Sequence, residues 1–202
     1  MKPRTNRDVL LALAHSREVL TAKAIAAAGI PSAVTSRLVG SGELIRLGGG
    51  VYRHPDGPIS EYHDLIQVAA RIDQGIVVLI SALQFHNLGV QRPHEVWIQL
   101  PAGQKLPPIS WPAVRVVRSR VAALLTQGVE YHVFSGIRVA VTTPARTVAD
   151  CFKYRNQVGL DTCIEAAREL FHRDRNAIDE LHAFAKLDRV HKVMLPYLAG
   201  LR

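Results

Sequence analysis

The sequence has few cysteines and no long apolar run, and each of these shortages excludes a class of protein. Its two cysteines, Cys151 and Cys163, are too few for a disulfide framework, and their spacing matches no zinc-binding pattern. Its apolar runs, such as residues 76–80, are far shorter than the roughly 20 residues that a membrane-spanning helix needs. The N-terminus has no apolar segment of the length typical of a signal peptide. We therefore expect a soluble protein of the reducing cytoplasm, with no membrane partner.

Sequence patterns that carry catalytic or metal chemistry are also missing. None of the nine histidines forms an HxxxH or HxxEH pair. No Gly-x-Ser-x-Gly segment is present, and the glycines at 48–50 lack the Gly-Lys-Ser/Thr of a phosphate-binding loop. The predicted strands are poor in the carboxylates that a magnesium-dependent nuclease needs, and Cys151 fits the core face of an amphipathic helix. We expect no catalytic residue, no metal and no cofactor, although a site assembled from distant residues stays open.

The chain is strongly basic, and its positive charge is densest near the N-terminus. The formal net charge is +8. Residues 1–57 carry 8 Lys/Arg and 4 Asp/Glu, whereas residues 58–202 carry 17 and 13 over a much longer stretch. This balance favours a polyanionic partner, with nucleic acid first. Apolar residues make up 48% of the chain, which permits a folded core.

The order of predicted elements in residues 6–54 is typical of a winged helix-turn-helix. Asn6 is the expected N-cap of a first helix and Thr21 that of a second. A Gly29-Ile-Pro31 corner ends the second helix and begins a third, which runs to about residue 40. A β-ribbon with a glycine turn follows at residues 44–53. In this motif the third helix enters the major groove of DNA and the ribbon contacts the flanking backbone.

Helical spacing divides the side chains of this segment between core and surface. The expected core positions are small or aliphatic: Ala22, Ile25, Ala26, Ala33, Val34 and Leu38. The outward positions are short hydroxyls and cations, which suit phosphate and base-edge contacts. The predicted DNA-binding residues are Ser32, Thr35, Ser36, Arg37, Arg46 and Arg53, with Arg4, Arg7 and Lys23 beside them. The alternative for Ser32 and Thr35 is that they only cap and solvate a helix.

The turn cluster at residues 55–58 indicates a domain boundary, which gives a domain at 1–57 and another at 58–202. The fold class is α+β, with an N-terminal winged helix-turn-helix and a mixed C-terminal domain that has a small sheet and terminal helices. Helices are predicted from Ser60 to 72, at 81–86, from Pro144 to 155, at 159–172 and at 178–199, and strands at 76–80, 95–100, 114–118, 128–134 and 137–141. The last two strands are expected to form a hairpin that turns at Ser135-Gly136, and Thr143 is the expected N-cap of the helix that begins at Pro144.

The second predicted domain carries arginines of its own. They are either scattered solubilising charge or a second surface for nucleic acid or an acidic partner. Because Arg118 and Arg120 are two positions apart near one strand, they could share a face of it. The residues of this predicted second basic surface are Arg115, Arg118, Arg120, Arg138 and Arg146.

Four segments in the same order give the chain a resemblance to the AbiEi antitoxins of type IV toxin–antitoxin systems. These segments read GGGVYRH, IVVLISALQFHNLG, EVWIQLP and IRVAVTTPARTVADCF. The resemblance implies a bacterial cytoplasmic protein that represses its own operon by binding double-stranded DNA at promoter repeats. It also implies that the protein counters a nucleotidyltransferase-like toxin encoded beside it. In such proteins the winged module binds DNA and the larger C-terminal domain is needed for antitoxicity, which we cannot place on single residues.

Two other functions stay open at this point. The protein could be a solitary winged-helix transcriptional regulator whose second domain senses a ligand or forms a dimer. It could also be a nucleic-acid-processing enzyme with a site that the sequence hides. A nucleotidyltransferase-like neighbouring gene would favour the antitoxin, and metal-dependent cleavage of nucleic acid would favour the enzyme.

Overall fold

The computed structural model describes residues 5–200, which form an α+β fold with a three-stranded and a five-stranded sheet. The chain divides into two compact units. The first unit comprises the described residues up to Asp73 together with 105–112 and 133–139, and the second unit comprises 74–104, 113–132 and the chain from 140 onward. The predicted boundary at 57/58 falls within the first unit. None of the helices within residues 5–200 has the length and apolar character needed to cross a membrane.

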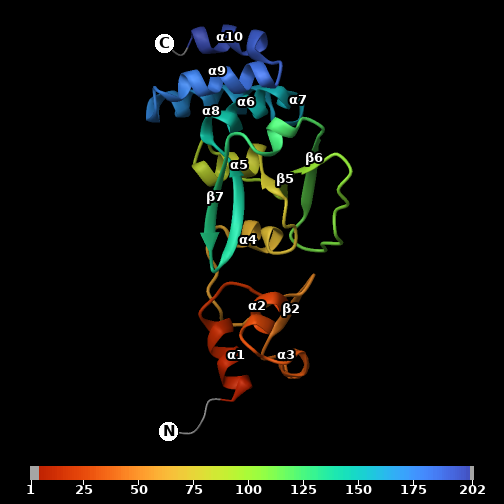
Figure 1. Ribbon diagram of the computed structural model, residues 1–202. Helices are drawn as coiled ribbons and strands as arrows, with labels where there is room; N and C mark the ends of the chain where they lie inside the picture. The colour runs from red at the N-terminus through yellow and green to blue at the C-terminus, as the bar shows by residue number, and fades with distance from the viewer. Residues whose placement is uncertain (1–4, 201–202) are drawn as a thin grey trace. The chain divides into compact units, whose positions relative to one another are not determined.

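The first unit has the element order of a winged helix-turn-helix (Figure 1). Its elements are α1 (Asn6–His15), β1 (Leu20–Thr21), α2 (Ala22–Ala27), α3 (Ser32–Gly40), β2 (Ile45–Gly48), β3 (Val51–Arg53) and α4 (His63–Ala69). β3 is the central strand of the three-stranded sheet, with β1 and β2 on its two sides. Both pairings are antiparallel.

Local capping explains where these helices begin and end. Thr5, not the predicted Asn6, caps α1, because Thr5 and Asp8 form a reciprocal capping box. The Thr21 side chain accepts a hydrogen bond from the amide of Ala24, as expected for the cap of α2. Gly29 follows α2 with φ of +74°, the left-handed conformation typical of a glycine after a helix.

The core of the first unit differs in part from the predicted one. Its buried residues come from α1, β1, α2, α3 and the loops on either side of α3: Leu10, Ala14, Leu20, Ile25, Ile30, Leu38 and Leu44. Ala22, Ala26 and Ala33 were predicted to face inward but are exposed, and Val34 is half-buried. Burying an alanine side chain gains little free energy because it is small. The large apolar residues Ile25 and Leu38 therefore set which faces of α2 and α3 turn inward.

The second unit contains the larger sheet and most of the helices. Its elements are β4 (Ile76–Val77), α5 (Leu79–His86), β5 (Val96–Pro101), β6 (Val114–Ser119), a 3₁₀ turn η1 (Ala122–Leu125), most of β7 (Val129–Phe134), half of β8 (Ile137–Thr142), α6 (Pro144–Lys153), α7 (Arg155–Val158), α8 (Leu160–Arg173), α9 (Ala177–Leu187) and α10 (His191–Ala199). The strand order is β6-β5-β4-β8-β7. β5 pairs with β6 in parallel and β4 pairs with β8 in parallel, while β4 and β5 are antiparallel.

α6 is the central helix of the second unit. Thr143 caps it and Pro144 is its first residue, as the sequence predicts. Ala145, Val148, Ala149 and Phe152 of this helix are buried in the main apolar core. α6 packs against α5, α8 and α9, and Figure 1 shows α8, α9 and α10 stacked beside it.

Two predicted elements of this unit are wrong in extent. The predicted strand 76–80 ends at Val77, because Leu79 has φ of +51° and begins α5. The predicted helix 178–199 is two helices, since Arg189 has φ of +61° and breaks the helix between them. By contrast, the predicted hairpin turn at Ser135-Gly136 is confirmed, with φ of +51° and +80°.

Candidate nucleic-acid interface

The exposed face of α3 is made of small side chains and one cation. Ser32, Ala33, Ser36 and Arg37 are all exposed, and their spacing places them on one side of the helix. Pro31 provides no side-chain cap for the first turn of α3. The side chains of this face are therefore short except for one guanidinium, and two of them carry hydroxyl groups. Together with the helix N-terminus, they suit close approach to phosphates and base edges.

Thr35 does not belong to this face. It was predicted to point outward, but its side chain is only 5% exposed and lies on the buried side of α3, as Leu38 does. The two residues are three positions apart and therefore share the inward stripe of the helix. Thr35 is a core residue, and we remove it from the candidate DNA contacts.

The β2–β3 ribbon forms a narrow wing. Gly48, Gly49 and Gly50 make its tip, with φ of +93°, +57° and +73°, all of them in the region that favours glycine. Arg46 lies on β2 opposite Tyr52, which is half-buried and packs against the core of the first unit. Arg46 itself is exposed.

The wing is held from two sides by contacts within the first unit. The amide of Ala22 donates a hydrogen bond of 2.7 Å to the carbonyl of Gly50. Arg71, which follows α4, donates from Nη2 to the carbonyl of Leu47 (2.5 Å) and from Nη1 to the carbonyl of Trp111 (2.6 Å). Burial lowers the pKa of Arg71, yet a guanidinium stays charged at any physiological pH. The tip is thus fixed before any ligand arrives, which reduces the entropy that binding would cost.

The predicted cations differ in how available they are. Arg37, Arg46 and Lys23 are exposed, and within residues 5–200 the structure gives them no ion pair. Arg7 is exposed but forms an ion pair with Glu43, which compensates its charge. Arg53 is half-buried and donates from Nη2 to the carbonyl of Pro55 (2.7 Å), so it supports the base of the wing and does not extend outward. Arg4 lies outside the described residues.

The residues of the predicted second basic surface do not form one surface. Arg115 and Arg118 are three positions apart on β6, and side chains at that spacing point to opposite faces of a strand. Arg115 pairs with Glu95 at 2.5 Å and stacks on the Trp97 ring, and Arg118 donates to two backbone carbonyls. Arg120 is exposed just beyond β6.

Arg138 belongs to the first unit. It lines a cavity of about 350 Å³ together with Lys23, Gly49 and Gly50 at the wing. The structure therefore associates Arg138 with the predicted DNA-binding residues, an association that the sequence does not indicate.

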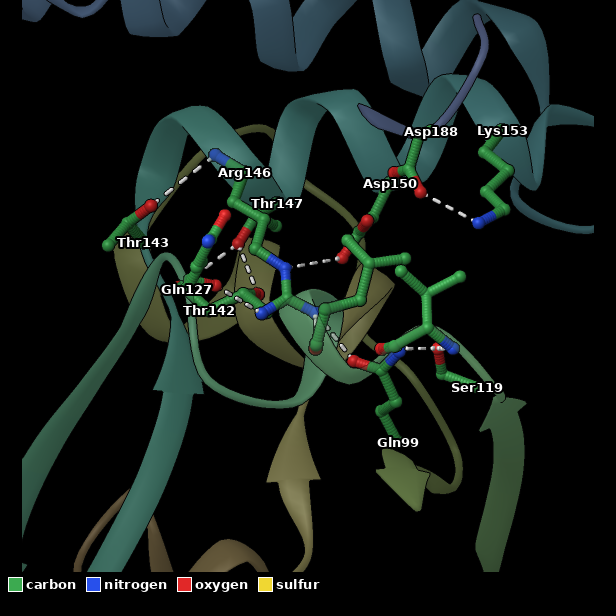
Figure 2. A network of polar contacts seen from close by, with 12 residues as sticks. Gln99, Ser119, Gln127, Thr142, Thr143, Arg146, Thr147, Asp150, Lys153 and Asp188 are labelled. Atoms are coloured by element: carbon green, nitrogen blue, oxygen red, sulfur yellow. Dashed lines mark hydrogen bonds and ion pairs between the residues drawn. The ribbon is translucent and has the colours of Figure 1, made fainter. Parts of the chain in front are cut away.

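Arg146 was predicted to lie on the surface, but it is fully buried in the second unit. Figure 2 shows its side chain within a network of polar contacts. The guanidinium donates to the carbonyls of Gln127 (2.7 Å) and Leu124 (2.5 Å) and to Oε1 of Gln99 (2.6 Å). Its Nε lies 3.4 Å from Oδ2 of Asp150. Arg146 therefore joins α6 to β5 and to the segment after η1, and it is unavailable to any external ligand.

Asp150, Asp188 and Lys153 continue this network (Figure 2). Lys153 Nζ lies 2.7 Å from Asp188 Oδ1. Burial, with smaller contributions from the hydrogen bond to Asp188 and its charge, raises the pKa of Asp150 well above its ordinary value. Both carboxyl groups are buried. The protonated form of Asp150 is therefore favoured over a wider pH range than that of an exposed carboxyl group.

The two cysteines are both free and buried, and Cys151 is a core residue, as predicted. Burial raises the pKa of both thiols, that of Cys163 to about 12. The thiolate form that reacts or binds metal is therefore scarce at neutral pH. Among the described side chains, no three His, Cys, Asp or Glu groups are placed to hold a metal ion.

Comparison with solved structures identifies a similar fold. No protein-family model and no curated protein matches the chain. The crystal structure of the RV2827C protein from Mycobacterium tuberculosis matches with a TM-score of 0.52 and 19% sequence identity, over 90% of this chain and 75% of that one. At this identity the similarity shows the fold alone.

Several residues that matter here are not indicated by the sequence pattern. Arg71 contacts Leu47, which is 24 positions away, and no local motif marks that contact. Asp150 and Asp188 are 38 positions apart and meet only because α6 packs against α9. A signal was present for Arg146, since an arginine and an aspartate four residues apart on a helix lie on the same face and can contact each other.

Proposed function

We propose that this protein binds double-stranded DNA through its first unit and acts as the antitoxin and autorepressor of a type IV toxin–antitoxin system. α3 would lie in the major groove, with Ser32, Ser36 and Arg37 against the bases and phosphates. The wing would contact the flanking backbone through Arg46, and Lys23 would add a further phosphate contact. The protein would act in the cytoplasm, where the operon and the toxin are.

Two features of the first unit together support the DNA-binding proposal. α3 has an exposed face of short side chains and an N-terminus without a side-chain cap, and the wing is held in place by hydrogen bonds. Ser32, Ala33, Ser36 and Arg37 present no bulky apolar side chain, so the helix backbone can approach a groove closely. The exposed Arg46 lies on a ribbon whose tip is held by Ala22 and Arg71. Phosphate contacts give affinity, and helix contacts in the groove give base preference.

The antitoxin role is supported by the resemblance to the AbiEi antitoxins over four ordered segments. It assigns the repressor activity to the first unit and the neutralisation of a nucleotidyltransferase-like toxin to the larger second unit.

DNA binding is tested by fluorescence anisotropy on the promoter of the protein's own gene. The double variant R37A/R46A removes two exposed cations from the interface, and R92A/K105A removes two exposed cations elsewhere. We expect the first variant to bind at least tenfold more weakly than wild type at moderate salt and the second to bind within about twofold. Equal affinity of wild type and R37A/R46A would overturn the proposed interface.

The antitoxin role is tested by co-expressing the full chain with the adjacent gene. Wild type should restore growth and repress a promoter reporter. R37A/R46A should restore growth but fail to repress, because the two activities belong to different units. Binding to the promoter without growth rescue would favour a solitary regulator instead.

A further inference from the structure

Three helices at the C-terminal end of the second unit line a cavity of about 530 Å³ that is open to solvent. α8 contributes Arg168 and Phe171, the loop after α8 contributes Arg175, α9 contributes Ile178, and α10 contributes Leu195 and Leu198. The cavity has an apolar floor and two arginines at its edge, and among the described residues that line it there is no carboxylate. We call it the C-terminal cleft.

The two arginines of the cleft are not used by the fold. Arg168 and Arg175 are exposed, and within residues 5–200 the structure gives neither a hydrogen bond nor an ion pair. Arg173, which lies between them in sequence, shows the contrast. It pairs with Glu169 and donates to the carbonyls of His86 and Asn87. The charge at the edge of the cleft is therefore uncompensated and complementary to an anion.

The floor of the cleft leaves apolar surface in contact with water. Leu195 is 44% exposed although it faces the cavity between α8 and α10. Apolar surface of this kind gains free energy when a ligand covers it, at roughly 25 cal/mol per Å². The volume lies within the range of about 300–1,000 Å³ that is typical of small-molecule sites, and it is too small for a folded partner.

We infer that the C-terminal cleft binds a free single-chain amphipathic anion, with a carboxylate or phosphate group at Arg168 and Arg175 and an apolar tail over Phe171, Leu195 and Leu198. Charge complementarity places the anionic group, and the apolar floor places the tail. This inference is independent of the proposed DNA binding, because all the residues of the cleft belong to the second unit.

The test uses the full chain and decyl phosphate below its micellar concentration. Isothermal titration calorimetry measures the affinity, and methyl NMR spectra locate the site. We expect saturable 1:1 binding, with shifts concentrated on Ile178, Leu195 and Leu198. Decanoate should bind as well, and decanol should bind about tenfold more weakly or not at all, because it lacks the charge.

Two variants of the cleft make the inference falsifiable. R168Q/R175Q should weaken decyl phosphate binding by about tenfold or more, whereas R92Q/K105Q removes the same charge elsewhere and should leave it unchanged. Ala199→Phe places a ring in the cleft and should abolish binding while thermal unfolding remains cooperative. Binding of equal strength in all these variants would overturn the inference, as would the absence of binding to wild type.

Other occupants give different results. Sedimentation with phosphatidylcholine–phosphatidylglycerol vesicles that R168Q/R175Q abolishes would assign the cleft to a membrane surface and contradict a free ligand. A concentration-dependent dimer that Ala199→Phe abolishes would assign it to a second copy of the chain. Neither is expected, since the cleft is small and only two arginines give it permanent charge, beside the titratable His172 and His182.

Discussion

The buried carboxyl groups of Asp150 and Asp188 are placed to form a hydrogen bond with each other when one of them is protonated, and burial together with this proximity raises the pKa of Asp150. Two carboxylates cannot form such a bond unless one of them carries a proton. Lys153 lies 2.7 Å from Asp188 Oδ1 and stabilises that group as the anion. Oδ2 of Asp188 is buried and has no hydrogen-bond partner among the described residues. A proton on Asp150 therefore satisfies an oxygen that would otherwise be left unpaired.

This arrangement predicts a loss of stability as the pH rises. Because the pKa of Asp150 is raised in the folded state, that state binds more protons than the unfolded chain between the ordinary pKa of an aspartate and the raised one. The free energy of unfolding must therefore fall as the pH rises through this interval. Asp150→Asn, which keeps a donor without a titrating proton, should remove that fall. Urea unfolding from pH 4 to 8 measures both slopes.

The control is Asp161→Asn, on the exposed surface of α8. It should retain the wild-type dependence of stability on pH. Identical slopes in wild type and Asp150→Asn would contradict the shared proton.

Arg146 gives a second stability prediction. Its guanidinium is fully buried and donates to Gln99, Leu124 and Gln127. Arg146→Met preserves the aliphatic stem but leaves these acceptors unpaired. We expect a loss of about 3 kcal/mol or more in the free energy of unfolding. Arg120→Met removes an exposed arginine and should cost less than about 0.5 kcal/mol. A loss below 1 kcal/mol in Arg146→Met would show that the network contributes little.

Gly128 adjoins this network, because the carbonyl of the preceding Gln127 accepts a hydrogen bond from Arg146. It has φ of +61°, and a Cβ there would overlap the Phe184 ring and lie 3.0 Å from Cδ of Arg146. Gly128→Ala should therefore destabilise the protein by about 2 kcal/mol or more in chemical denaturation. Gly103→Ala is the matched control, because a Cβ at Gly103 meets nothing within 4 Å. Equal stability of the two variants would mean that the backbone at Gly128 relaxes freely.

Sequence signals that depend on neighbouring residues were reliable. The Gly29-Ile-Pro31 corner, the Ser135-Gly136 turn and the Thr143-Pro144 helix start are all confirmed, because each depends on the backbone preference of one or two residues. The α+β fold class is also confirmed.

Features that depend on long-range packing were predicted less well. Thr35 was assigned to the wrong face of α3, since alanine, serine and threonine differ too little in hydropathy to fix the helical phase. Arg146 was assigned to the surface, because its acceptors come from segments 19 to 47 positions away. The division of the chain into units was not predictable either, because the β7–β8 turn and residues 105–112 group with the first unit.

Arg46 and Arg53 should behave differently when DNA binding is measured against salt. Arg46 is exposed on the wing, so Arg46→Ala should remove one phosphate contact and reduce the slope of log K against log salt by about 0.9. Arg53 donates to Pro55, so Arg53→Ala should leave that slope unchanged and lower the stability of the first unit by about 1 kcal/mol. Anisotropy titrations at several salt concentrations, with urea unfolding, separate the two. A reduced slope in Arg53→Ala would show that Arg53 leaves Pro55 to contact DNA.

Arg71 tests whether the rigidity of the wing contributes to binding. Arg71→Met removes the donors to Leu47 and Trp111 and leaves the Ala22–Gly50 hydrogen bond as the remaining contact at the tip. Amide hydrogen exchange at the wing tip should accelerate while the rest of the first unit keeps its protection. DNA affinity should fall several-fold, because a mobile wing must be ordered on binding. The salt slope should stay at the wild-type value, since Arg71 acts through the backbone of the wing. A slope reduced by about 0.9, as expected for Arg46→Ala, would show instead that Arg71 contacts a phosphate directly.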